Sequence, residues 1–62
     1  MWIKFNSTYY NLDRITKIEF STDTFGYERF FVIIDNYKYE VTKQNYIKIQ
    51  NYVEQKLKEN LL

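Results

Sequence analysis

The side chains of this sequence that could do chemistry are few in kind. The 62 residues include no His and no Cys, which excludes His-based triads, thiolate nucleophiles and the commonest zinc ligands. Carboxylates remain, but Asp13, Asp23 and Asp35 fall in segments with turn chemistry, where Asp bonds to its local backbone. None has the spacing of an acid–base pair or of a calcium loop. We therefore expect no enzyme, no cofactor, no metal site and no small-molecule substrate.

Charge and hydropathy exclude further classes of function. Nine basic and eight acidic residues leave a net charge of +1, so no global field draws the chain to nucleic acid or to an anionic membrane. The longest apolar run, from Phe30 to Ile34, is far shorter than a membrane span, and the first residues lack the regions of a signal peptide. We expect a single compact cytoplasmic domain over residues 1–62.

Aromatic rings are the other abundant chemistry, with seven Tyr, five Phe and one Trp. Rings exposed on a sheet can stack bases while nearby lysines contact phosphates. Trp2, Phe31 and the lysines therefore suggest an alternative function, the binding of single-stranded nucleic acid. Most of the tyrosines are more simply explained as core residues, since the pattern below places Tyr37 and Tyr39 in the core.

The apolar run from Phe30 to Ile34 must be covered on both faces, because successive side chains of a strand point to opposite sides. A two-residue turn at Asp35-Asn36 would pair this strand with Tyr37 to Thr42 and place Ile34 opposite Tyr37. Cross-strand neighbours share a face. The predicted core face comprises Phe30, Val32, Ile34, Tyr37, Tyr39 and Val41, and the outer face comprises Phe31, Ile33, Lys38 and Glu40.

Two explanations are open for Phe31 and Ile33 on that outer face. Long Lys and Glu stems can lie across apolar residues, or the two can anchor a partner within a charged rim. The chain has no second helix to cover them, which favours a protein partner or a second copy, bound at this face or at a sheet edge. The predicted partner-binding residues are Trp2, Lys4, Lys17, Phe31, Ile33 and Lys38.

The remaining elements follow from periodicity and caps. We expect a short hairpin from Trp2 to Tyr10, followed by a single helical or turn-like corner at Asn11 to Ile15 in which the Asn11 side chain caps exposed amides. Thr16 to Thr22 alternates as a half-buried strand with Ile18 and Phe20 inward. Thr42 caps a helix from Lys43 to Asn60. Its apolar stripe is Tyr46, Ile49, Val53, Leu57 and Leu61. The fold class is thus α+β, a small antiparallel sheet of about four strands with one C-terminal helix packed on one face.

The spacing Asn11-x-x-x-Ile15-x-x-Ile18-Glu19, followed by an apolar strand, a polar turn, a strand ending at Val41 and an apolar-striped helix, resembles the FlbD type of small flagellar and swarming-associated proteins. The resemblance implies an accessory, non-enzymatic role and transfers no active site. Phe, Tyr, Ile, Asn and Lys make up about half of the chain, and their AT-rich codons indicate an AT-rich bacterium, phage or plasmid as the source. Small chains of that origin often act as accessory or inhibitor proteins.

Overall fold

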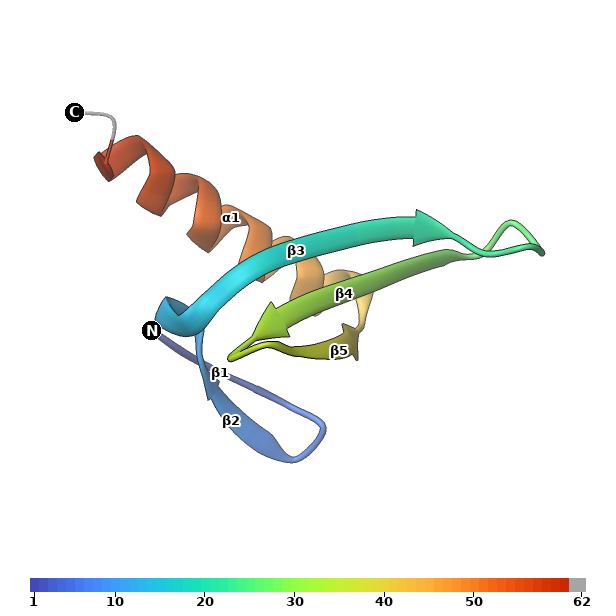
Figure 1. The fold of residues 1–62 in the computed structure, drawn as a ribbon, viewed down its shortest axis with the longest axis horizontal. Helices are drawn as coiled ribbons and strands as arrows, with labels where there is room; N and C mark the ends of the chain where they lie inside the picture. The colour runs from blue at the N-terminus through green and yellow to red at the C-terminus, as the bar shows by residue number, and fades with distance from the viewer. Residues whose placement is uncertain (61–62) are drawn as a thin grey trace.

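The fold is α+β, with five strands in two antiparallel sheets and one C-terminal helix (Figure 1). It is known from a computed structural model that describes residues 1–60. The elements are β1 (Trp2–Phe5), β2 (Thr8–Asn11), a 3-10 turn (Leu12–Arg14), β3 (Ile15–Thr22), β4 (Glu28–Ile34), β5 (Tyr37–Val41) and α1 (Lys43–Asn60). The prediction of about four strands in one sheet is therefore corrected to a two-stranded sheet, β1-β2, and a three-stranded sheet, β3-β4-β5.

The central hairpin has the predicted register. Ile34 pairs with Tyr37 and Phe30 with Val41 across β4 and β5. Asp35 and Asn36 both have positive φ, 51° and 70°, as a two-residue turn that matches the twist of the strands requires. On the other side of β4, Ile18 of β3 faces Val32 and Glu19 faces Phe31, after a bulge between Ile15 and Lys17.

Helix α1 covers the inner face of the three-stranded sheet. The Thr42 hydroxyl accepts a hydrogen bond from the Asn45 amide at 3.2 Å, which confirms the predicted N-cap. Ile49 is fully buried at the centre of the core, and the ring of Tyr46 lies 5.0 Å from that of Phe30. Leu61, the last residue of the predicted stripe, lies outside the described residues.

The first hairpin is a separate sheet because the chain turns sharply after β2. Leu12–Arg14 forms a 3-10 turn, and the Asn11 side chain accepts from the Asp13 amide at 3.0 Å, the capping predicted for this corner. The hairpin then joins the core through its side chains. The rings of Phe5 and Tyr10 stack with their centres 4.2 Å apart, and the centre of the Tyr10 ring lies 4.8 Å from that of Tyr39 of β5.

The helix crosses the sheet diagonally, from the end of β5 to the start of β3, and this decides which inner-face residues are buried (Figure 1). Val32, Ile34, Val41 and the other core residues Phe5, Leu12 and Ile49 are buried. Two residues predicted for the core face are exposed instead, Tyr37 at 68% and Phe20 at 53%. Both lie at corners of the sheet that the diagonal path of α1 leaves uncovered, although the register of Tyr37 opposite Ile34 was predicted correctly.

Within the described residues, no helix is both long enough and apolar enough to cross a membrane.

Candidate functional site

The outer face of the three-stranded sheet gathers four of the six predicted partner-binding residues, Lys17, Phe31, Ile33 and Lys38. Phe31 and Ile33 are half-buried. The Lys38 ammonium lies 4.5 Å from the centre of the Phe31 ring and 2.9 Å from Glu19. Lys17 contacts the same carboxylate at 2.9 Å. Glu19 thus holds two lysines, and one of them lies over the aromatic ring.

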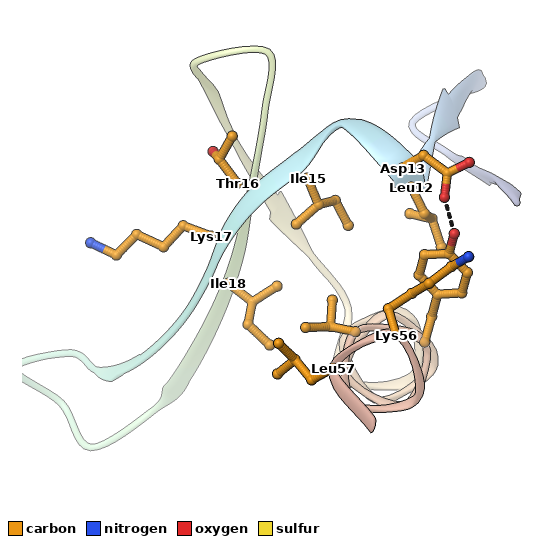
Figure 2. Close-up of a pocket in the computed structure, with 10 residues that line it drawn as sticks. Leu12, Asp13, Ile15, Thr16, Lys17, Ile18, Lys56 and Leu57 are labelled. Carbon is orange, nitrogen blue, oxygen red and sulfur yellow. Dashed lines mark hydrogen bonds between the residues drawn. The ribbon is translucent and has the colours of Figure 1, made fainter. Parts of the chain in front are cut away.

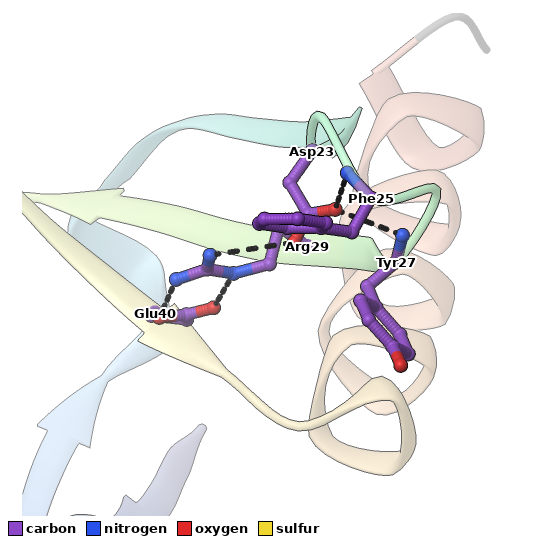
Figure 3. A network of polar contacts seen from close by, with 5 residues as sticks. All are labelled: Asp23, Phe25, Tyr27, Arg29 and Glu40. Atoms are coloured by element: carbon purple, nitrogen blue, oxygen red, sulfur yellow. Dashed lines mark hydrogen bonds and ion pairs between the residues drawn. The ribbon is translucent and has the colours of Figure 1, made fainter.

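A second ion-pair network lies on the same face and, together with Lys38, covers the ring of Phe31 (Figure 3). Arg29 donates to both carboxylate oxygens of Glu40, and its guanidinium lies 6.0 Å from the centre of the Phe31 ring. Asp23 lies on the other side of Arg29, with an oxygen at 3.9 Å. The carboxylate of Glu40 raises the pKa of Arg29, and Arg29 lowers the pKa of Glu40. The arrangement corresponds to the first of the two explanations for Phe31, since cationic side chains lie across the ring.

The pKa of Glu19 tests whether Lys17 and Lys38 are held over the outer face by this carboxylate. Hydrogen bonds from Lys17 and then Lys38 lower its pKa below the ordinary 4.5. A depressed folded-state pKa stabilises the fold above pH 4.5, and that contribution is lost as the pH falls through the folded-state value. We expect a Glu19 titration midpoint below 4.5 by NMR, and a rise toward 4.5 in Lys38→Gln. Lys43→Gln, whose lysine contacts Glu28 instead, should leave the midpoint unchanged, and an unchanged midpoint in Lys38→Gln would contradict the assignment.

Trp2 and Lys4 do not join this face, which corrects the prediction that they lie beside Phe31. Both belong to the first hairpin, where Trp2 pairs with Asn11 and Lys4 with Tyr9. The Lys4 ammonium lies 5.5 Å from the centre of the Tyr9 ring, and Trp2 and Tyr9 are 65% and 66% exposed. The prediction failed because it placed both hairpins in one sheet, whereas the 3-10 turn separates them.

A groove opens on the opposite side of the sheet, between β3 and the C-terminal half of α1 (Figure 2). Its volume is about 430 Å³. Leu57 of α1 faces Ile18 of β3, with Ile15 beside them (Figure 2). Leu57 is 57% exposed although it was predicted to be part of the core stripe. The reason is that β3 is the edge strand and the end of α1 extends past it (Figure 1), so that Leu57 is covered by β3 on one side only.

One end of the groove is fixed by a polar contact between distant segments. The Tyr52 hydroxyl of α1 donates to the Asp13 carboxylate of the 3-10 turn, and the amino terminus lies 3.5 Å from the same carboxylate. The hydrogen bond from Tyr52 lowers the pKa of Asp13 and raises the pKa of Tyr52 to about 12. This contact holds α1 against the corner that precedes β3.

The main-chain groups along the groove side of β3 have no partner strand within residues 1–60. In a two-residue hairpin the closing pair, here Ile34 and Tyr37, exchanges both backbone hydrogen bonds, and such pairs alternate along an antiparallel ladder. Phe31 therefore directs its backbone groups to β3, where it faces Glu19. The residues of β3 that lie between those bonded to β4 direct their backbone N–H and C=O groups away from β4, toward the free edge. These edge residues are Ile18, Phe20 and Thr22.

The opposite edge of the sheet is less open. β5 has five residues, three fewer than β3. The first hairpin lies beside it and packs Phe5 and Tyr10 against Tyr39 (Figure 1). The hollow between them is lined largely by polar and charged residues, including Asn6, Lys38 and Glu40. The sequence could not decide which strand lies at a free edge, because that depends on where the first hairpin packs.

Within residues 1–60, no group of three or more acidic side chains could hold a metal ion. Comparisons of the chain with protein families, with curated proteins and with solved structures found no match. The resemblance to FlbD-type proteins therefore stays a prediction from the residues. The candidate site is therefore a mainly apolar groove beside the free edge of β3, with Asp13, Lys17 and Lys56 also in its lining.

Proposed function

We propose that this chain is a non-enzymatic protein-interaction module that binds another polypeptide at the free edge of β3. The observation that carries the proposal is the coincidence of that edge with the groove under α1. A strand added to β3 would use the main-chain groups of Ile18, Phe20 and Thr22 for affinity. Its alternate side chains would enter the groove, where Leu57 is exposed.

The outer sheet face is the less favoured surface for a partner. Phe31 is covered by Lys38 and Arg29, and a partner would have to displace ion pairs to reach it. The groove needs no such rearrangement. From Lys17 to Thr22 the edge strand β3 pairs regularly with β4, and its inner face carries the apolar side chains of Ile18 and Phe20. An unpaired strand of this kind can recruit another strand.

Two variants separate the edge from the outer face. Thr22→Pro removes an outward-facing N–H and leaves the ladder to β4 intact, since the outward residues do not bond to β4. Phe31→Lys disrupts the outer face alone. We expect a polypeptide partner captured from the native host by the wild-type protein to be retained by Phe31→Lys and lost by Thr22→Pro, as measured by quantitative mass spectrometry.

The opposite pattern, with the partner lost in Phe31→Lys and retained in Thr22→Pro, would place the partner on the outer face and refute the proposal. Both variants should first show the circular dichroism of the wild type, so that a loss of binding is not a loss of folding.

The exposed hairpin face favours a second candidate function, single-stranded nucleic-acid binding. Trp2 and Tyr9 are exposed beside Lys4, the combination that stacks bases and contacts phosphate. If this function is correct, the affinity for a labelled oligonucleotide should fall steeply as salt rises and should be lost in Trp2→Ala. Absence of binding at low salt would exclude it.

A further inference from the structure

We infer that the polypeptide bound at the free edge of β3 is a second copy of this chain, paired antiparallel through β3 about a two-fold axis at Phe20. The inference rests on the proposed function, because it names the occupant of the same edge. It joins two three-stranded sheets into one sheet of six strands, with both helices on the same side. The register follows from a comparison of the four alignments that place the axis at one of the residues from Ile18 to Ser21.

Like charges exclude two alignments. Pairing β3 with its own copy about an axis at Glu19 places the two Glu19 carboxylates directly opposite each other on the outer face. An axis at Ser21 places Glu19 opposite Asp23 of the second copy. Like charges in directly opposed positions of a sheet are destabilising, so neither alignment is favoured.

The bulge excludes a third alignment. An axis at Ile18 matches Lys17 with Glu19 of the second copy, but it also pairs Phe20 with Thr16. Thr16 lies within the bulge between Ile15 and Lys17, where the ladder is irregular. Only the central Ile18 pair would then form regular backbone hydrogen bonds.

An axis at Phe20 avoids both problems. Ile18 faces Thr22 of the second copy and Phe20 faces its equivalent, so all the outward main-chain groups of the regular part of β3 find partners. On the outer face Lys17 lies opposite Asp23 of the second copy, whose carboxylate also faces Arg29 of its own chain. Glu19 lies opposite the uncharged Ser21, so no like charges are opposed. On the inner face the half-exposed Phe20 ring, already 5.4 Å from Phe30, meets a second aromatic ring.

The same alignment gives the overhanging end of α1 something to cover. In an antiparallel pair the start of β3, where the groove opens, lies beside the residues that follow β3 in the other copy. Those residues are the Asp23–Tyr27 loop, which carries two of the most exposed aromatic side chains, Phe25 at 85% and Tyr27 at 70%. Because the groove is near one end of β3 and the loop near the other, both copies make the same contact and the two helices do not collide.

The first experiment measures the dimer itself, by sedimentation equilibrium of the purified protein over a range of concentrations. We expect the wild type to form dimers and Phe20→Lys, which places two ammonium groups at the axis, to raise the dimer Kd by at least about tenfold. Tyr37→Lys is the matched control, since it makes the same change at an exposed aromatic residue on the far strand of the sheet. It should dimerise as the wild type does.

The second experiment tests the register by disulfide formation, with a clean background because the chain has no Cys. Equivalent positions at the axis are about 5.5 Å apart between Cα atoms, within disulfide range. The two copies of residue 18 would be about 13 Å apart, roughly four residues along a strand, and beyond that range. We expect Phe20→Cys to form a covalent dimer on mild oxidation and Ile18→Cys to stay monomeric on a denaturing, non-reducing gel.

Failure of the inference is distinguishable from failure of the proposed function. A protein that stays monomeric at all concentrations, yet loses a host polypeptide on Thr22→Pro, would overturn the homodimer and leave the edge-binding function standing. Dimers that persist unchanged in Phe20→Lys, or that cross-link through Ile18→Cys instead, would overturn the proposed register. A monomeric protein with no edge-dependent partner would refute both.

Discussion

Ile49→Ala should unfold a large fraction of the protein. Ile49 is completely buried where α1 meets the sheet, and truncation of such an Ile typically costs about 2–5 kcal/mol in transfer and cavity terms. A domain of this size has a total stability of roughly 3–5 kcal/mol. We expect the urea midpoint, followed by far-ultraviolet circular dichroism, to fall to near zero denaturant.

The same helix supplies the matched control. Ile47 lies two residues earlier on α1 and is 44% exposed, so Ile47→Ala should cost about 1 kcal/mol or less. Both variants should be compared at low protein concentration, because a dimer that forms at higher concentration adds to the measured stability. Equal losses in the two variants would contradict the placement of α1 on the sheet.

The second large effect is on the pH dependence of stability, through the contact between Tyr52 and Asp13. Asp13 raises the pKa of Tyr52 to about 12 from an ordinary value of 10.0. A folded-state pKa above the unfolded value means that the stabilisation is fully present below about pH 10 and is lost as the pH rises toward 12. In Tyr52→Phe the tyrosinate absorbance titration should lose the tyrosine that ionises near pH 12. The free energy of unfolding should also fall less between about pH 10 and pH 12 than it does in the wild type.

The acid side has the opposite sign. The hydrogen bond from Tyr52 lowers the pKa of Asp13 below 3.8, so this contribution is present above pH 3.8 and disappears as the pH falls through the folded-state value. Tyr52→Phe should move the Asp13 midpoint upward by NMR. Tyr27→Phe, at a tyrosine that is 70% exposed, is the control and should leave the Asp13 midpoint as it is in the wild type.

These two predictions concern the segments that shape the groove. Ile49 fixes α1 on the sheet, and Tyr52 fixes the later turns of α1 to the corner before β3. If the contact at Asp13 is lost, the groove between Ile18 and Leu57 loses one of its walls. Weaker edge binding in Tyr52→Phe would therefore connect the position of the helix with the proposed interface.

Local patterns in the sequence were sufficient for most of the secondary structure. The hairpin register across Asp35 and Asn36 follows from alternation and from a turn of two residues, both of which are properties of neighbouring residues. The Thr42 cap and the start of α1 are equally local, because the capping hydroxyl and the amide it accepts from are three residues apart. The same holds for the capped corner at Asn11, whose side chain and bonded amide are two residues apart.

The assignment of the surface was less successful, since exposure depends on how whole elements pack. Lys17, Phe31, Ile33 and Lys38 were placed on one face because strand parity and register determine a face. Trp2 and Lys4 were wrongly added to it, because no local pattern shows that the 3-10 turn at Leu12–Arg14 separates the first hairpin from the larger sheet. The cover over Phe31 also requires Arg29, which alternation puts on the same face but whose pairing with Glu40 is a tertiary contact.

The sequence by itself determined the order of the elements, the pairing of β4 with β5 and the faces of the strands, since these follow from side-chain alternation and from turn and cap residues close along the chain. Only the tertiary structure decided which strand edge is free and where apolar residues stay exposed. The diagonal path of α1 leaves Leu57 at the open edge of β3 and Tyr37 uncovered. The first hairpin packs beside β5 and leaves β3 open. These outcomes depend on the angle at which a rigid helix crosses a twisted sheet, which is set by packing between distant residues.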